Sequence, residues 1–215
     1  MNSVPVLAAA ALLDAERLVG TDGTRTSWSD LGVPAPGDGR TFRAVFGRGD
    51  ETFRRLDVAS RALVLAAEAL GLPRVLPAAH HDRTAIVLAT TLGCLDADRQ
   101  FAQSLGAEML DAPVFPYTLP STCLGELALR HGLRGAGVCL SVAPDDGGAG
   151  FAEAVRLLAT GEADAVVAGV VDVSRADPAT CAVTLALLAA PRLGLPSLAP
   201  WRGDPFAAVR AALLP

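Results

Sequence analysis

Residues 131–169 read HGLRGAGVCLSVAPDDGGAGFAEAVRLLATGEADAVVAG, and this stretch decides the fold. Gly135–Ala143 is a short apolar run typical of a buried strand. Residues 148–160 have helical spacing and are followed by Gly161, a common helix terminator. Ala165–Val171 (AVVAGVV) is a second apolar run. A strand, a helix and a strand in this order predict a mostly parallel or mixed sheet with helices on its faces.

The same alternation continues on both sides of this stretch. Amphipathic spacing predicts helices, and continuous apolar runs rich in β-branched residues predict strands that are buried on both faces. The expected helices are 50–70, 96–110, 122–131 and a short one before Leu214, and the further strands are 84–91 and 180–188. The fold class is therefore α/β, with a mixed, mostly buried sheet flanked by helices.

Three segments have less regular patterns. Residues 4–19 combine strand and helix signals, and residues 21–49 are rich in Gly, Pro, Ser and Thr, which predicts a long loop. Residues 112–120 are expected to be extended, because prolines at 113, 116 and 120 disfavour an α-helix.

The composition excludes several kinds of function. The 215 residues carry 18 basic and 23 acidic side chains, a net charge of −5, and every basic residue is Arg. Without Lys, neither a P-loop lysine nor a Schiff-base lysine is available. No Arg cluster marks a nucleic-acid surface. The four Cys (94, 123, 139 and 181) lack the short spacing of redox or zinc sites, so we expect reduced thiols, no metal and no cofactor.

No apolar run reaches the 18 residues that a membrane-spanning helix needs. Val4–Leu13 is short and lacks the basic flank of a signal peptide. We therefore expect a soluble, cytoplasmic protein that forms a single domain over residues 1–215, without a membrane partner.

The order and spacing of these segments resemble the N-terminal half of the β-ketoacyl synthases, which have the thiolase-like fold. The resemblance is carried by Phe115–Thr122 (FPYTLPST), the HGLRG turn at 131–135, the strand and helix that follow it, and ADAVVAG at 163–169. It is clearest over residues 57–173 and leaves residues 1–50 without a recognised motif. It implies a thiolase-like half-fold.

In that family the strand leads to a sharp elbow, where a Cys at the start of a buried helix accepts the acyl group. The helix dipole lowers the pKa of such a thiol, and backbone N–H groups stabilise the oxyanion. Counting back from Gly161 by the family's spacing places Pro144 at the nucleophile position. Proline has neither a nucleophile nor an N–H, and the charges of Asp145 and Asp146 oppose an oxyanion. The resemblance therefore implies a vestigial elbow without a catalytic residue, where the two aspartates are expected to cap the helix.

Full ketosynthases have a second half, which supplies two His and a Lys that activate malonyl thioester. The chain ends near where that half would start, and it has no Lys. His80 and His81 precede the first clear strand and are expected to be solvated. His131 lies at the end of a helix, where a protonated imidazole would complement the helix dipole.

A ketosynthase-like chain without a nucleophile resembles the chain-length factors. These proteins pair with an active ketosynthase in polyketide, aryl-polyene-type or fatty-acid-like biosynthesis. The resemblance implies that this chain is not an enzyme on its own, and that its partners are a full-length β-ketoacyl synthase, in a heterodimer, and an acyl carrier protein.

In family dimers the strand before the elbow pairs across the two-fold axis, and the segment ahead of the preceding helix reaches the acyl tunnel. By position these are residues 138–142 and 115–123. The implied tunnel and interface residues are Phe115, Thr118, Leu119, Thr122, Cys123, Val138, Leu140 and Val142. Whether residues 138–142 lie at the edge or in the centre of the chain's own sheet stays open at this point.

Two other functions also stay open. One is a binding module that docks an acyl carrier protein or a scaffold protein without shaping a tunnel. The other is a malonyl decarboxylase that uses Asp145 or Asp146.

Overall fold

The computed structural model describes residues 4–33, 39–107, 109–177 and 179–214. In this part of the chain the strands form one sheet in the order β3-β2-β1-β7-β6-β4-β5, and β8 also pairs with β1. The strands are β1 (Val6–Asp14), β2 (Arg17–Gly20), β3 (Arg25–Ser27), β4 (Thr84–Thr90), β5 (Gly137–Ser141), β6 (Ala165–Val173), β7 (Cys181–Ala189) and β8 (Ala199–Pro200).

The helices lie between these strands along the chain. The α-helices are α1 (Trp28–Leu31), α2 (Thr41–Phe46), α3 (Val58–Leu70), α4 (Leu72–Val75), α5 (Leu95–Ser104), α6 (Thr122–His131), α7 (Ala149–Thr160) and α8 (Pro205–Leu213). The 3-10 helices are η1 (Phe53–Arg55), η2 (Ala78–Arg83), η3 (Ala112–Thr118) and η4 (Pro191–Leu193). Within the described residues no helix is long and apolar enough to cross a membrane.

The sheet is mixed, as the sequence predicts. β4 lies between β5 and β6 and runs parallel to both, with Leu88 paired to Cys139 on one side and to Gly169 on the other. β7 is antiparallel to both of its neighbours, β6 and β1. The helices α5, α6 and α7 provide the crossovers that parallel strands require.

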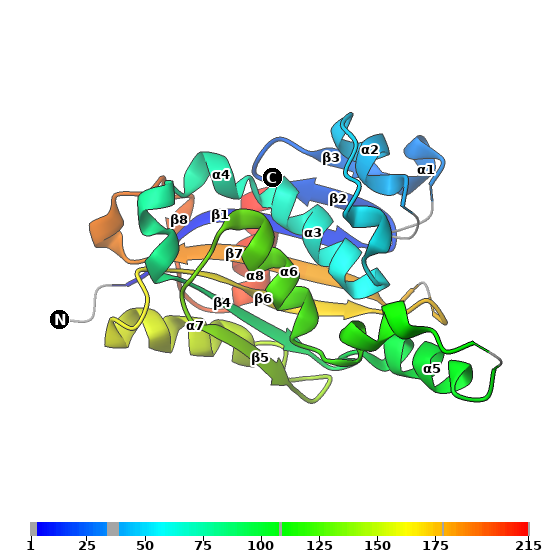
Figure 1. Ribbon diagram of the computed structural model, residues 1–215. Helices are drawn as coiled ribbons and strands as arrows, with labels where there is room; N and C mark the ends of the chain where they lie inside the picture. The colour runs from blue at the N-terminus through cyan, green and yellow to red at the C-terminus, as the bar shows by residue number, and fades with distance from the viewer. Residues whose placement is uncertain (1–3, 34–38, 108, 178, 215) are drawn as a thin grey trace.

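Helices cover both faces of the sheet (Figure 1). Residues of α3 and α6 pack on one face and residues of α7 and α8 on the other. β4 shows the alternation: Ile86 and Leu88 join the α3/α6 core, whereas Ala85 and Val87 join the α7/α8 core. This two-sided burial explains why the strand is apolar throughout.

Residues 4–19 form two antiparallel strands, so the prediction of a partly helical segment is wrong. Ala8–Ala11 of β1 are buried in the central sheet, where α3 and α8 pack against the strand. Alanine favours a helix locally, but here its small side chain allows helices to approach both faces of the sheet. The predicted loop over 21–49 contains β3, α1 and α2, and its residues 34–38 lie outside the described residues.

Three other boundaries differ from the predicted ones. The helix expected over 50–70 begins at Val58, because the Asp57 carboxylate accepts a hydrogen bond from the Ser60 N–H at 2.9 Å and caps it. α5 ends at Ser104 rather than at Leu110. Residues 112–118 form η3 rather than an extended segment, since the φ angle of proline also fits a 3-10 helix.

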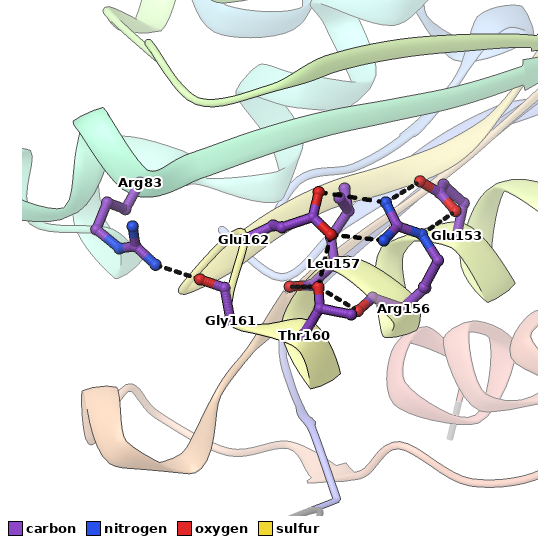
Figure 2. A network of polar contacts seen from close by, with 7 residues as sticks. All are labelled: Arg83, Glu153, Arg156, Leu157, Thr160, Gly161 and Glu162. Atoms are coloured by element: carbon purple, nitrogen blue, oxygen red, sulfur yellow. Dashed lines mark hydrogen bonds and ion pairs between the residues drawn. The ribbon is translucent and has the colours of Figure 1, made fainter.

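Arg156 organises the polar network at the carboxyl end of α7 (Figure 2). Its guanidinium donates to both carboxylate oxygens of Glu153 at 2.8 Å and to Glu162 at 2.6 Å. Glu153 and Arg156 are three residues apart on one face of the helix, and Glu162 extends the pair into the following turn. Arg83 donates to the Gly161 carbonyl at 2.5 Å. Because these groups are largely exposed, the network orients the turn into β6 more than it stabilises the fold.

We expect Gly169→Ala to reduce the free energy of unfolding by about 3 kcal/mol. A Cβ at Gly169 would lie 2.1 Å from the Thr184 carbonyl oxygen of β7 and 2.6 Å from a methyl group of Leu185. Urea unfolding monitored by circular dichroism measures the change. Gly125→Ala is the matched control, because a Cβ there meets no atom within 4 Å and alanine stabilises a helix by up to about 1 kcal/mol. Equal effects of the two substitutions would contradict this description of the packing.

Candidate functional site

The elbow between β5 and α7 is an exposed turn. β5 ends at Ser141 and α7 begins at Ala149, and Pro144, Asp145 and Asp146 are all exposed to solvent. The Asp146 N–H donates to the Ala143 carbonyl at 3.0 Å, and the Ala149 N–H donates to the Asp146 carbonyl at 3.0 Å. Backbone hydrogen bonds therefore shape this turn.

Asp145 and Asp146 do not cap α7, so that prediction is wrong. The N-cap residue is Gly148, and no side chain accepts a hydrogen bond at this helix end. Gly147 and Gly148 lengthen the turn and move the start of the helix away from the aspartates. Gly147 lies against α8, where a Cβ would be 3.2 Å from the Phe206 ring.

The predicted tunnel segment, 115–123, meets the predicted interface strand, 138–142, at a pair of cysteines. Cys123 of α6 and Cys139 of β5 line the same void of about 10 Å³, which Leu88, Pro120 and Val171 also line. A void of this size holds about one water molecule and admits no acyl chain.

Leu119, Thr122 and Cys123 line a second void, also of about 10 Å³, together with Cys94 and Tyr117. The Thr122 hydroxyl donates to the Pro116 carbonyl at 2.5 Å, which joins the first turn of α6 to η3. The structure thus brings these three predicted residues together.

The remaining predicted residues of segment 115–123, Phe115 and Thr118, lie in η3. The Cys94 thiol donates to the Thr118 carbonyl at 3.1 Å, and the Thr118 hydroxyl donates to the Phe115 carbonyl at 2.8 Å. The Phe115 ring lies 5.2 Å from the ring of Phe101, yet 60% of Phe115 is exposed.

The sheet divides the predicted set. Val138 and Leu140 pack against the α7/α8 core, on the opposite face from Cys139. Val142 follows β5, and its N–H donates to the Thr90 carbonyl at 3.0 Å. Val138 and Leu140 therefore lie on the opposite face of the sheet from Cys123, which shares a void with Cys139.

β5 is an edge strand, which answers the question that the sequence left open. Within the described residues it pairs with β4 alone, and Figure 1 shows it at the margin of the sheet. The prediction of a buried strand over 135–143 is therefore wrong, and Gly137 and Ser141 are exposed.

The free side of β5 presents hydrogen-bonding groups. The Ala136 carbonyl accepts from the Ile86 N–H, and the Val142 N–H donates to β4. Because backbone groups alternate along a strand, the amides of Gly137, Cys139 and Ser141 point to the open edge. An apolar edge strand of this kind favours pairing with another chain.

Large exposed apolar side chains lie on the elements that lead to β5. α5 contacts η3, η3 contacts α6, and α6 contacts β5. We define the open face as the free edge of β5 together with the exposed side chains of Leu105, Met109, Leu110, Phe115, Leu119 and Leu129.

Leu129, which is 84% exposed, is a member of the open face that the sequence analysis missed. A signal for it existed in the spacing of α6. Leu124, Leu127 and Ala128 form the apolar stripe of the helix, and Leu129 lies outside that stripe.

The thiols near the elbow are protonated at neutral pH. Burial and the neighbouring Asp98 raise the pKa of Cys94 to about 11. Burial raises the pKa of Cys123 to about 12, and it also raises the pKa of Cys139. None of the three therefore replaces the nucleophile that Pro144 lacks.

The histidines lie at the opposite end of the parallel strands from the elbow. His80 and His81 are in η2, directly before β4, and His131 ends α6. Burial, Arg130 and His81 lower the pKa of His131 to about 4, so the predicted cationic cap is wrong and the imidazole is neutral at neutral pH. Within the described residues no three His, Cys, Asp or Glu side chains are placed to hold a metal ion.

The family model for the β-ketoacyl synthase N-terminal domain matches residues 14–191. The chain belongs to this family. The match extends beyond residues 57–173, where the motifs are clearest, and includes all of β2 to β7. No curated protein sequence matches the chain.

Solved structures share the fold of this ketosynthase-family chain at low sequence identity. The ishigamide ketosynthase/chain length factor is 19% identical with a TM-score of 0.67, over 91% of this chain and 65% of that chain. The AntDE:AntF type II polyketide synthase complex is 14% identical with a TM-score of 0.69, over 92% and 67%. The ketosynthase ApeO in complex with its chain length factor ApeC, from Xenorhabdus doucetiae, is 19% identical with a TM-score of 0.57, over 87% and 79%. The chain thus spans less than two thirds of the ishigamide protein.

We expect iodoacetamide to alkylate Cys94 and Cys123 roughly 100-fold more slowly in the folded chain at pH 8 than in the urea-unfolded chain. Their raised pKa values leave few thiolates to react. Peptide mass spectrometry over a time course measures both rates. Cys139 is expected to react slowly as well, and its rapid alkylation in the folded chain would reveal an activated thiol near the elbow.

Proposed function

We propose that this chain is a non-catalytic ketosynthase-like subunit of the chain-length-factor type. It pairs with an active β-ketoacyl-ACP synthase in polyketide, aryl-polyene-type or fatty-acid-like biosynthesis. The observation that carries the proposal is the free edge of β5, the strand that pairs across the two-fold axis in family dimers. Two relatives of the same fold are described as a ketosynthase with its chain length factor.

The backbone of β5 favours a strand as the partner. The amides of Gly137, Cys139 and Ser141 are directed toward the free edge, so a strand of the ketosynthase would extend the sheet from one subunit into the other. Hydrogen bonds along the edge would fix the register between β5 and the partner strand. The side chains on both faces of the strand would make the pairing specific for this ketosynthase.

The apolar part of the open face supplies a driving force for association. Phe115, Leu119 and Leu129 are each at least 60% exposed. Burying one such side chain fully stabilises a complex by about 1.5–3 kcal/mol. Large apolar side chains that cluster on a protein surface are typical of protein–protein interfaces.

The elbow favours a complex in which only the partner subunit carries out acyl transfer. Pro144 offers no nucleophile, and the nearby thiols are protonated, so the acyl transfer would take place in the partner ketosynthase. Leu119, Thr122 and Cys123 would line the tunnel that the two subunits form together. An acyl carrier protein would present the growing chain to the complex.

We expect Ser141→Pro to weaken the heterodimer at least ten-fold, because it removes an outward N–H from the edge of β5. The free chain should lose less than about 1 kcal/mol of stability, since this N–H has no partner within the sheet. Co-expression with the ketosynthase encoded beside its gene, followed by size-exclusion chromatography and a titration, measures the affinity. Ser141→Ala is the matched control and should bind like the natural chain. A chain that stays monomeric beside this ketosynthase, or a Ser141→Pro variant that binds normally, would contradict the proposed pairing.

We expect Leu119→Phe to shorten the product, because a larger side chain would reduce the depth of the tunnel. Mass spectrometry of the product of the reconstituted complex measures its chain length. Cys139→Ala is the control and should leave product formation unchanged, since Cys139 has no catalytic role in this proposal. An unchanged product length with an intact Leu119→Phe heterodimer would show that Leu119 does not line the tunnel.

A further inference from the structure

A histidine side chain lies where the carboxyl end of α6 meets η2. The Nε2 atom of His131, the last residue of α6, is buried, and no hydrogen-bonding group among the described residues reaches it. Buried polar atoms are nearly always paired, and an unpaired one calls for a physical explanation. The chain is bonded to η2 just after this histidine, because the Arg134 N–H donates to the His81 carbonyl at 3.0 Å.

The charged groups on the elements around this imidazole are either positive or already paired. Arg130 precedes it in α6, forms an ion pair with Asp50 and lies 3.8 Å from Glu68. The acidic residue of η2, Asp82, accepts a hydrogen bond from the Arg134 side chain at 2.7 Å. The other ionisable residues of α4 and η2 are all basic: Arg74, His80, His81 and Arg83. A protonated imidazole would therefore find no unpaired carboxylate on these elements.

Protonation of His131 costs more in this position than in the unfolded chain. In the protonated ring both nitrogens carry a proton, so Nε2 would hold an N–H that no acceptor reaches. Burial, Arg130 and His81 accordingly lower the pKa of His131 from 6.5 to about 4. Because this pKa is lowered in the folded chain, the neutral ring contributes its full stabilisation above pH 6.5. That stabilisation is lost as the pH falls from 6.5 to 4.

The packing beside His131 is incomplete. A cavity of about 250 Å³ lies between α4, η2 and the end of α6, and its apolar lining includes Leu72, Leu76 and Leu133. Parts of a protein with few buried apolar contacts open locally at a lower free energy than the core. Separation of the end of α6 from η2 would let water reach the imidazole while the sheet stays folded.

We propose that His131 makes this contact pH-sensitive: protonation of its imidazole releases the carboxyl end of α6 from η2 and α4. At neutral pH the ring is uncharged and the contact is closed. In mild acid the open form binds a proton that the closed form does not, so the equilibrium moves toward the open form. The proposal uses no part of the pairing through β5, and failure of either one leaves the other intact.

A nuclear magnetic resonance titration of the imidazole Cε1 protons tests the first step, and the chain has only three His. We expect the His131 resonance to keep the shift of the neutral ring down to pH 5.5, where an ordinary histidine is mostly protonated. The loss of one resonance in His131→Leu identifies it. A His131 resonance that titrates near pH 6.5 in the folded chain would overturn the proposal.

Hydrogen exchange followed by mass spectrometry tests the release itself. We compare peptides covering residues 126–131 in the natural chain and in His131→Leu at the same pH. We expect the ratio of their exchange rates to rise about 20-fold between pH 7 and pH 5, because the pKa of the ring is 6.5 in the open form and about 4 in the closed form. His80→Leu is the matched control, since His80 lies outside the lining of the cavity, and its ratio should not change with pH. A pH-independent ratio for His131→Leu would contradict the proposal.

The same measurement shows where the chain opens. At pH 5 the carboxyl end of α6 should exchange faster than α3, which lies in the buried core of the natural chain. Equal rates would mean that the whole chain unfolds together, and they would overturn the release of this helix end. Circular dichroism establishes that each variant is folded. If His131→Leu does not fold, His131→Gln takes its place, because its side chain is also uncharged at both pH values.

Discussion

The central strands of the sheet are buried on both faces, so their backbone groups have to pair with neighbouring strands. β4 illustrates this constraint, because all its residues are buried and it pairs with β5 and β6. Pairing in parallel requires long crossovers, and these crossovers place α6 on one face and α7 on the other. The same arrangement leaves β5 at the margin, where half of its backbone groups face away from the sheet. The strand order of the fold therefore also leaves free the edge on which the proposed pairing depends.

The elbow shows how the surrounding packing of the fold is kept around an exposed turn. A helix still follows the strand, and Gly150 allows it to pack closely, since a Cβ there would be 3.2 Å from both the Ala89 side chain and the Gly169 carbonyl. What differs is the turn itself, where Pro144, the two aspartates and two glycines stand between β5 and α7. Packing limits which residue types the helix and the sheet can have. The residue at the tip of the exposed turn would be limited only if it took part in a reaction.

Much of the fold could be predicted from local patterns. The strands around Val87, Val167 and Leu187 are continuous apolar runs, and Gly161 ends its helix as predicted. The predictions fail where local preference and tertiary packing disagree. The alanines of β1 are helix formers that the sheet holds in an extended conformation. The prolines of η3 exclude an α-helix but not a 3-10 helix.

The sequence by itself determined the α/β class, the family and the proline at position 144, because the order of apolar runs and the identity of a residue are local properties of the chain. Only the tertiary structure decided which strand is the edge, since an edge and a central strand can have the same apolar alternation. The tertiary structure also decided that Cys123 and Cys139 share a void and that Nε2 of His131 is buried without a partner. These features depend on which segments meet in space, and contacts between residues far apart in the chain leave no periodic signal in it.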